Sequence, residues 1–319
     1  MTSDALIGHT GFVGSILQGQ HDFAARFNSA NIDAIAGQAF DTVVCAAAPG
    51  SMFTANRQPD QDRAAIEALI ERLDAVQAQS FVLISSIAVL ADFAGQDDEG
   101  TEAYQQELAY GRHRRLLEAF CETRFEDCLV VRLPALFGPG LRKNFIFDLM
   151  NPVPTMLPEA RLQALLDLLA PDLRDTLGGL YAPDPVTGMM KLDRAALDAG
   201  PHRGALDAAV RDHGFAATQF HNPETTYQYY DMSRLWQDIG TARGAGLGHI
   251  HLAVEPLKAA DIHSRLLGSP MPETGARLHH EDMRTRHADL WGRQGPYLED
   301  VATVLDKLAA FFAGQEAAA

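Results

Sequence analysis

The sequence predicts an α/β fold, a doubly wound parallel sheet followed by a smaller, mostly helical lobe. Three observations support this prediction. Short apolar runs alternate with amphipathic stretches over residues 1–150, which is the pattern of βαβ units. A glycine-rich turn joins the first apolar run to the first amphipathic stretch. After residue 150, prolines punctuate helical segments and strand signals become sparse.

The predicted sheet is assembled from short apolar runs in the first part of the chain. We expect strands over residues 5–7, 23–27, 42–46, 81–84 and 129–133. Helices are expected at 11–18, 60–76 and 107–120, and the second of these carries an apolar stripe at helical spacing. Pro134 and a turn through residues 137–140 should end the last of these strands.

The remaining elements are mostly helices. We expect helices over residues 159–169, 203–211, 233–243 and 300–313, a strand over 249–254, and frayed residues 317–319. Alternating aromatics in residues 227–230 suit a half-buried strand, with sugar stacking as the alternative interpretation. The chain therefore divides into residues 1–150, 151–226 and 227–319.

Composition excludes several classes of function. Among 319 residues, 42 are acidic and 26 basic, and a net charge of -16 disfavours binding to nucleic acid. No apolar stretch is long enough to span a membrane, and no basic segment precedes the first apolar run. Three cysteines, Cys45, Cys121 and Cys128, lie among apolar neighbours at spacings that match no metal site. We expect a cytoplasmic protein.

The glycine-rich turn is Gly8-His9-Thr10-Gly11-Phe12-Val13-Gly14. It follows the first predicted strand directly and opens the first predicted helix. Glycines there let the backbone turn tightly and approach a pyrophosphate, whose charge the helix N-terminus stabilises. The turn therefore predicts a dinucleotide site.

The choice between NAD and NADP depends on the end of the second strand. An NAD site usually has a carboxylate there for the ribose 2′-hydroxyl, whereas this chain has Arg26-Phe27-Asn28-Ser29. Arg26 and Asn28 should share one face of the strand, where they could accept a 2′-phosphate. This favours NADP(H), with a solvated strand-end charge as the alternative.

A hydroxyl, a phenol and a cation follow at the expected carboxyl edge of the sheet. Ser85 and Ser86 end the strand over 81–84, Tyr110 begins the next helix, and Arg114 lies one turn later. A phenol becomes a useful acid or base only where a nearby cation stabilises its phenolate. A neighbouring hydroxyl can bond the same substrate oxygen.

These segments together resemble the extended short-chain dehydrogenase/reductase family, in its NAD-dependent epimerase/dehydratase branch. The resemblance rests on residues 8–14, 41–48, 82–86, 110–114 and 131–140, which occur in the family's order. It implies a Rossmann-type sheet with a C-terminal substrate lobe. It is fainter over residues 248–266, which look like the family's late strand and following helix.

The resemblance assigns roles to individual residues. Ser86 would orient the substrate oxygen, Tyr110 would transfer its proton, and Arg114 would bind the nicotinamide ribose and support the tyrosine. The expected NAD(P)-binding residues are Gly8, Thr10, Gly11, Phe12, Val13, Gly14, Arg26, Asn28, Ala46, Ala47, Ala48, Ser85, Tyr110, Arg114 and Pro134.

The chain departs from the family pattern at two positions. The family has lysine where this chain has Arg114, and arginine is bulkier, planar and never gives up its proton. Nucleotide-sugar members tend to carry asparagine where this chain has Ala135, which weakens the case for a diphosphate-linked sugar. Residues 142–144 could bind an anionic group instead, or form a solvated loop.

The histidines and a late basic run suggest two further sites. His249 and His251 would share one face of a strand, and further histidines lie at 279, 280 and 287. No third metal ligand follows from their spacing, so we expect no metal. The basic run at 284–287 could bind an anion, with a salt-bridged surface as the expected alternative.

The sequence therefore predicts an NAD(P)-dependent oxidoreductase or epimerase for a small sugar-like substrate, nucleotide-activated or not. Ile87 and Ala88 offer no additional acid or base beside Ser86, which disfavours a dehydratase. The alternative is a non-catalytic NAD(P)-binding sensor or scaffold with a drifted active site, which Arg114 supports. Residues 151–226 could shape the substrate pocket or form the surface of a homodimer.

Overall fold

The computed structural model describes residues 3–316, so the expected frayed residues 317–319 lie outside it. Contacts divide the chain into two units. Unit 1 comprises Met1–Leu141, Thr226–Leu257 and His280–Ala319, and unit 2 comprises Arg142–Thr225 and Lys258–His279. Residues 258–279, which were expected in the C-terminal part, pack within unit 2. Each unit has its own hydrophobic core.

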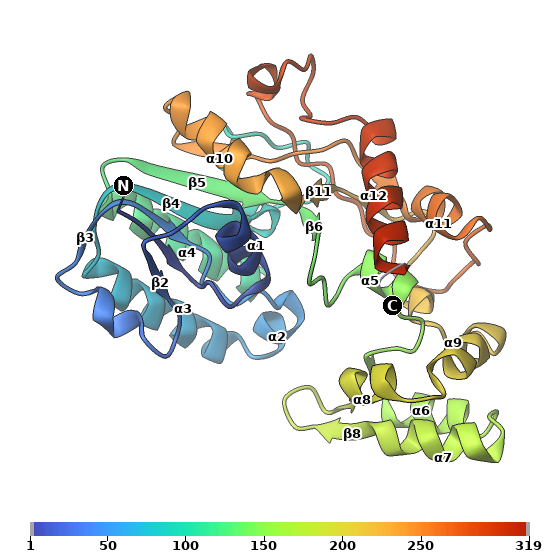
Figure 1. Cartoon of the computed structure of the whole chain (residues 1–319). Helices are drawn as coiled ribbons and strands as arrows, with labels where there is room; N and C mark the ends of the chain where they lie inside the picture. The colour runs from blue at the N-terminus through green and yellow to red at the C-terminus, as the bar shows by residue number, and fades with distance from the viewer. Residues whose placement is uncertain (1–2, 317–319) are drawn as a thin grey trace. The chain divides into compact units, whose positions relative to one another are not determined.

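Unit 1 is built on a six-stranded sheet in the order β12-β5-β4-β3-β1-β2 (Figure 1). Its strands are β1 (Asp4–Ile7), β2 (Ala25–Phe27), β3 (Ala39–Cys45), β4 (Gln77–Ser86), β5 (Cys128–Leu133) and β12 (His249–His251). All neighbouring strands run parallel, and the strand order reverses between β1 and β3. The predicted α/β, doubly wound Rossmann-type fold is confirmed.

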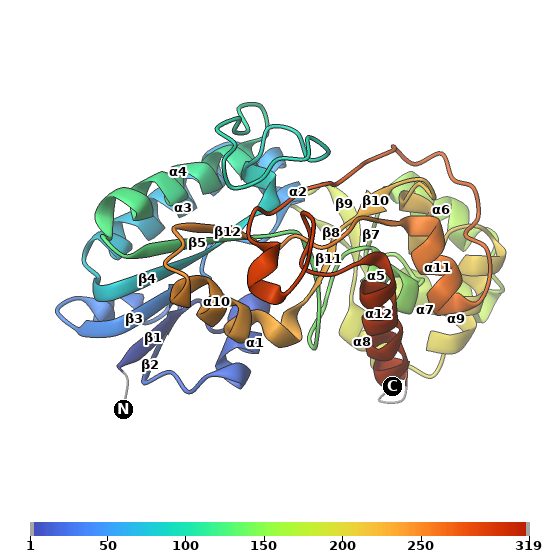
Figure 2. The same ribbon diagram turned by 90° about the horizontal axis from the view of Figure 1, so that it is seen from above.

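Helices cover both faces of this sheet (Figure 2). On one face α3 (Pro59–Asp74) packs against α4 (Ala109–Arg124), and on the other α1 (Phe12–Gln20) packs against α10 (Leu235–Gly244). Because both faces are covered, the central strands are mostly apolar without alternation, and all four residues of β1 are buried. The carboxyl ends of β1 and β3 meet where the strand order reverses, which is where open α/β sheets bind ligands.

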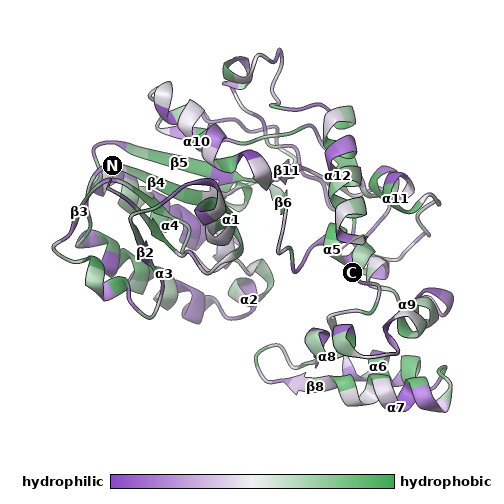
Figure 3. Cartoon of the chain, viewed as in Figure 1, coloured by the Kyte–Doolittle hydropathy of each residue, from purple (hydrophilic) through white to green (hydrophobic). Residues whose placement is uncertain are grey.

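The core between the sheet and the α3–α4 layer holds aliphatic and aromatic side chains, among them Phe81, whose ring stacks on Phe125 with centroids 4.0 Å apart. The sheet strands accordingly appear mostly green in the hydropathy view (Figure 3). Burial raises the pKa of Cys45 to about 11 and that of Cys128 to about 12, and it also raises the pKa of Cys121. The three free thiols stay protonated and pack as apolar groups.

The rest of unit 1 consists of short elements and one long helix. These are η1 (Ile32–Ile35), α2 (Met52–Arg57), η2 (Ile87–Val89), β6 (Ala135–Phe137), β10 (Thr226–Tyr227), β11 (Tyr229–Asp231), η4 (Met232–Arg234), β13 (Leu257–Lys258), η5 (Ala288–Trp291) and α12 (Val301–Glu316). Strands β6 and β11 pair in parallel, and α12 packs on β11.

The aromatic stretch at 227–230 forms two short strands where one was expected. Gln228 interrupts it, and its buried side chain is enclosed by backbone groups. Its Nε2 donates to the carbonyls of Val254 (2.6 Å) and Met283 (2.7 Å), and its Oε1 accepts from the N–H of Met283 (2.7 Å). These three bonds replace a continuous strand ladder, so Tyr227 and Tyr229 belong to different sheets.

Unit 2 is mostly helical, as predicted, but it also contains a small antiparallel sheet in the order β7-β9-β8. The elements are α5 (Phe145–Met150), β7 (Met156–Leu157), α6 (Glu159–Leu166), α7 (Pro171–Leu180), β8 (Tyr181–Asp184), β9 (Met189–Leu192), α8 (Arg194–Ala199), α9 (Arg203–Asp212), η3 (Ala217–Phe220) and α11 (Ala259–Leu267). The strands have two to four residues, too few for an alternation to be visible. Leucines from the surrounding helices form the core.

The predicted elements otherwise differ from the structure mainly at their ends. The strand expected over 249–254 ends at His251, although Leu252, Ala253 and Val254 stay buried beyond it. Among the described residues, no helix is both long and apolar enough to cross a membrane.

Candidate active site

The glycine-rich turn packs tightly against the end of β3. Gly8 has a φ of +88°, and its N–H donates to Phe27 O (2.8 Å) at the end of β2. A Cβ on Gly8 would lie 2.5 Å from the carbonyl oxygen of Ala46, and one on Gly14 would lie 2.1 Å from the carbonyl oxygen of Gly8. Neither position has room for a side chain, so both glycines are required by packing.

The same turn leaves the start of α1 open. Gly11 is the N-cap of α1, with no side-chain cap and no acidic residue in the first turn. A Cβ on Gly11 would meet only the carbonyl oxygen of Gly8, at 3.4 Å. Thr10 and Gly11 are exposed, and Phe12 and Val13 are half-buried. The positive end of the helix is thus available to an anion.

Arg26 and Asn28 lie beside this turn, at the carboxyl end of β2. Strand β2 ends at Phe27, so Asn28 lies in the following turn and the two do not share a strand face. The Asn28 side chain accepts from the N–H of Ala30 (2.9 Å), and exposed Arg26 makes a long ion pair with Asp22 (3.4 Å). Such an exposed pair holds Arg26 weakly and leaves it able to turn toward another anion.

The two serines at the end of β4 point to different environments. Ser85 is buried, and its Oγ donates to Glu118 Oε1 on α4 (2.5 Å). Ser86 is half-buried, and its Oγ accepts from the N–H of Ala88 (3.2 Å), which caps η2. Ser86 is therefore the serine at the surface of the sheet edge.

Tyr110 is brought to this edge by close backbone packing. A Cβ on Gly111 would lie 1.8 Å from the carbonyl oxygen of Ala88, so the first turn of α4 contacts η2 without any side chain between them. The N–H of Tyr110 donates to Asn56 Oδ1 on α2 (2.9 Å). Because η2 follows Ser86 directly, the structure brings Tyr110 and Ser86 to neighbouring segments, and Tyr110 stays half-buried.

Arg114 lies beneath Tyr110 in a buried ion pair that sequence reasoning missed. Its Nη1 donates to both carboxylate oxygens of Asp62 on α3 (2.9 and 2.7 Å), and its Nη2 donates to the carbonyl of Pro49. Its Cζ lies 3.8 Å from the centroid of the Tyr110 ring. His113 Nδ1 lies 2.8 Å from the same carboxylate, so two side chains of α4 converge on Asp62.

A second buried network joins Ser85 to the far strand of the sheet. Arg132 of β5, fully buried, donates to Glu118 through Nε (3.0 Å) and Nη2 (2.7 Å). Its Nη1 lies 3.1 Å from His251 Nε2 on β12. Glu118 thus ties α4, which carries Tyr110, to β4 and β5, and Arg132 extends the network to β12. An arginine in the otherwise apolar run 129–133 was the only sequence signal for such a network.

His251 is neutral in this network, with its proton on Nδ1. The guanidinium can only donate, so Nε2 accepts and Nδ1 donates to the carbonyl of Arg284 (2.9 Å). Burial lowers the pKa of His251 from its ordinary 6.5; the Glu99 carboxylate opposes this effect and the Arg132 charge adds to it.

His249 and two arginines of the late basic run have protein partners. His249 Nε2 pairs with Glu122 Oε1 (2.9 Å), and Arg286 pairs with Asp98 (2.7 Å). Arg284 pairs with Asp282 (3.5 Å). The run 284–287 is thus a salt-bridged segment, and within residues 3–316 no cluster of three metal-ligating side chains is found.

The remaining predicted residues of unit 1 lie at ends of sheet strands. Ala46, Ala47 and Ala48 follow β3 directly, and the backbone of the first two contacts Gly8. Pro134 is buried between β5 and β6, and Ala135 begins β6 opposite Tyr229.

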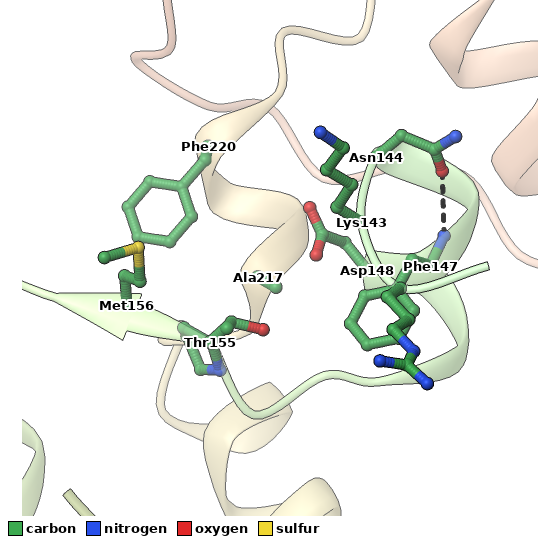
Figure 4. A pocket seen from close by; sticks show the side chains of 10 residues that line it. Lys143, Asn144, Phe147, Asp148, Thr155, Met156, Ala217 and Phe220 are labelled. Carbon is green, nitrogen blue, oxygen red and sulfur yellow. Dashed lines mark hydrogen bonds between the residues drawn. The ribbon is translucent and has the colours of Figure 1, made fainter. Parts of the chain in front are cut away.

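Unit 2 contains a pocket of about 270 Å³ (Figure 4). Its apolar lining comes from Phe147, Pro154, Met156, Ala217 and Phe220. Asp148 also lines it, and its Oδ2 pairs with His221 Nε2 (2.8 Å). The expected anion-binding residues 142–144 line it as well, with Arg142 and Lys143 exposed and Asn144 capping α5 through the N–H of Phe147 (3.2 Å).

Comparison with models of known protein families gives one match. Residues 24–163 match the model of the NAD dependent epimerase/dehydratase family. The match begins after the glycine turn and includes Ser86, Tyr110 and Arg114. It confirms the resemblance predicted from the sequence over strands β2 to β5. A search of curated protein sequences finds no significant match.

Individual solved structures share the fold over the full length of the chain. RMD from Pseudomonas aeruginosa, complexed with NADPH, is 16% identical with a TM-score of 0.62, and each chain is covered completely. The dTDP-4-dehydrorhamnose reductase of Bacillus anthracis, in complex with NADP, is 12% identical with a TM-score of 0.61, covering 98% of this chain and 99% of that one. A UDP-galactose 4-epimerase is 15% identical with a TM-score of 0.60, covering 98% of this chain and 99% of that one.

Proposed function

We propose that this chain is an NAD(P)-dependent oxidoreductase or epimerase that acts on a hydroxyl or carbonyl of a sugar-like substrate. The observation that carries the proposal is the packing of Gly111 on the Ala88 carbonyl, which sets Tyr110 beside the strand end that bears Ser86. The family match and the NADPH and NADP complexes of similar folds support it.

The residues of the glycine turn fit the diphosphate of a dinucleotide. Gly8 and Gly14 leave no room for a Cβ, so the turn stays close to β3, while Gly11 is exposed at an uncapped helix start. Backbone N–H groups and the helix dipole would hold the two phosphates there. When bound, the nicotinamide takes or gives a hydride at a substrate carbon.

We further propose NADP(H) as the preferred form. Arg26 lies near the glycine turn, and its exposed ion pair with Asp22 is weak enough to exchange for a 2′-phosphate. A ribose 2′-hydroxyl would ordinarily be bound by a carboxylate at this strand end, where the chain has Arg26 and Asn28.

Ser86 and Tyr110 would carry out the proton chemistry. The Ser86 hydroxyl would hydrogen-bond the substrate oxygen and orient it toward Tyr110. In reduction, the Tyr110 hydroxyl gives its proton to the carbonyl oxygen as that carbon gains a hydride, and in oxidation the phenolate takes the proton back. Independently of this proton chemistry, the pocket of unit 2, which is lined by apolar side chains and by residues 142–144, could bind an anionic group.

The test follows cofactor absorbance while the purified chain is incubated with NADPH or NADH and candidate keto and hydroxy sugars. We expect turnover that Tyr110→Phe reduces by about a hundredfold or more, because the variant lacks the hydroxyl that gives the proton. Tyr227→Phe, in the same unit and outside the proposed site, should leave turnover unchanged. Full activity of Tyr110→Phe would exclude the proton-transfer role.

One observation favours the alternative, a non-catalytic NAD(P)-binding sensor or scaffold. The Arg114 guanidinium is already bonded to Asp62 and Pro49, whereas the family's lysine would be available to a ribose. Tight dinucleotide binding by the native chain without oxidation or reduction of any candidate sugar would favour this function.

A further inference from the structure

The surroundings of Arg114 indicate what this arginine does at the position where the family has lysine. Nη1 donates to both carboxylate oxygens of Asp62 and, at 3.4 Å, to the carbonyl of Tyr110. Nη2 donates to the carbonyl of Pro49, and Nε is buried without a hydrogen-bond partner. The Arg114 residue is 2% exposed, and Asp62 and His113 are also buried. A ribose hydroxyl at the sheet edge would therefore find no accessible N–H on this side chain.

The guanidinium instead contacts Tyr110. Its Cζ lies 3.8 Å from the ring centroid, within the range of a cation–π contact. This arrangement needs a flat cation whose edge is bonded while its face meets the ring. An ammonium group has no such face, so the arrangement is specific to arginine.

Asp62 decides which way the guanidinium faces. It lies on α3, where it accepts both Arg114 bonds and a contact from His113 Nδ1 at 2.8 Å. Its negative charge compensates a cation that is otherwise enclosed by protein, and compensation of this kind is needed for a buried charge. Without Asp62, the guanidinium would lose both its counter-charge and its orientation.

We propose that Asp62 and Arg114 form a positioning pair that holds the Tyr110 ring, and that Arg114 acts through this ring and not by binding the cofactor. This inference rests on the proposed function for its consequence in turnover. It also predicts a ring contact that can be observed without cofactor.

The first experiment separates cofactor binding from turnover in Arg114→Lys. We expect the NADPH dissociation constant, from fluorescence titration, to stay within about twofold and kcat to fall by about tenfold or more. Arg112→Lys, an exposed arginine on the same helix, is the matched control and should change neither. If lysine at 114 tightens NADPH binding or preserves kcat, Arg114 acts as the family's lysine does and the proposal is wrong.

The second experiment needs no cofactor. In protein labelled with ¹³C-tyrosine, the Tyr110 ring resonance, assigned with Tyr110→Phe, should shift in Asp62→Asn because the guanidinium leaves the ring. Glu67→Gln on the same helix removes the exposed Arg63 pair (2.8 Å) and should leave the resonance in place. An unchanged resonance in Asp62→Asn would refute the positioning role.

A double variant keeps the proposal testable if Asp62→Asn fails to fold. If Asp62→Asn does not fold, the double variant Asp62→Asn with Arg114→Gln removes both charges and should fold, bind NADPH and show the shifted ring resonance. If this double variant keeps the native resonance or native kcat, the proposal is overturned. A native chain that binds neither NADPH nor NADH would refute the proposed function, and the ring experiment would still decide the positioning pair.

Discussion

Replacing Gly111 with alanine should separate α4 from η2 and so disable the candidate site. The added Cβ would lie 1.8 Å from the carbonyl oxygen of Ala88 and 2.8 Å from its carbon. A carbon and a carbonyl oxygen normally approach to about 3.3 Å, so the helix must move by roughly 1.5 Å. The obstacle is backbone, which cannot rotate away as a side chain can.

The expected loss is at the upper end of overpacking costs, about 3 kcal/mol or more of unfolding free energy. Differential scanning calorimetry should show the unit 1 transition lowered by roughly 5–10 °C. Turnover should fall by about a hundredfold, because a displacement near 1 Å of a catalytic group has this effect.

Gly240→Ala is the matched control for this substitution. Gly240 lies within α10, and an added Cβ would meet nothing within 4 Å. Alanine is the better helix former, so the control should be neutral or stabilising by about 0.5–1 kcal/mol. If Gly111→Ala unfolds with the native midpoint and keeps its turnover, the close contact between α4 and η2 does not position Tyr110.

Three further outcomes test the cofactor turn and the buried network. Gly14→Ala, whose Cβ would lie 2.1 Å from the Gly8 oxygen, should weaken NADPH binding in a fluorescence titration by about tenfold or more, and an unaltered dissociation constant would contradict this. Glu118→Gln leaves the buried Arg132 without its counter-charge and should lower the unfolding free energy in urea by about 3–5 kcal/mol; a loss under about 1 kcal/mol would argue against a buried ion pair. The folded state keeps His251 neutral, whereas in the unfolded chain this histidine takes up a proton near pH 6.5. The unfolding free energy should therefore fall as the pH drops below about 6.5. In His251→Gln it should fall less steeply.

Much of the candidate site could be predicted at the carboxyl edge of the sheet, because the sequence patterns that mark it lie within one or two elements. The glycine turn follows a strand and opens a helix within a few residues, and Tyr110 and Arg114 are separated by one helical turn. Apolar runs located the six main strands, since burial on both faces leaves most of their residues apolar. Only their ends were uncertain, as at His251, where the chain leaves the sheet while it stays buried.

The partners of the polar residues could not be predicted in this way. Asp62 meets Arg114 across 52 positions, and Arg132 meets His251 across 119. No periodicity links such positions, because they are joined by the packing of α3 on α4 and of β12 on β5. The small sheet of unit 2 was missed for a different reason, since its strands are too short to show alternation.

The sequence by itself determined the parallel sheet, the turn suited to a dinucleotide, and the order of serine, tyrosine and arginine along the chain. These depend on spacing within one or two elements, which backbone geometry translates directly into position. Only the tertiary structure decided that Ser85 turns inward to Glu118, that Ser86 stays at the edge, and that Arg114 faces the Tyr110 ring. These side-chain orientations depend on charged groups that come from elements distant in sequence. A buried charge is costly unless an opposite charge pairs with it, and only the folded chain brings the two together.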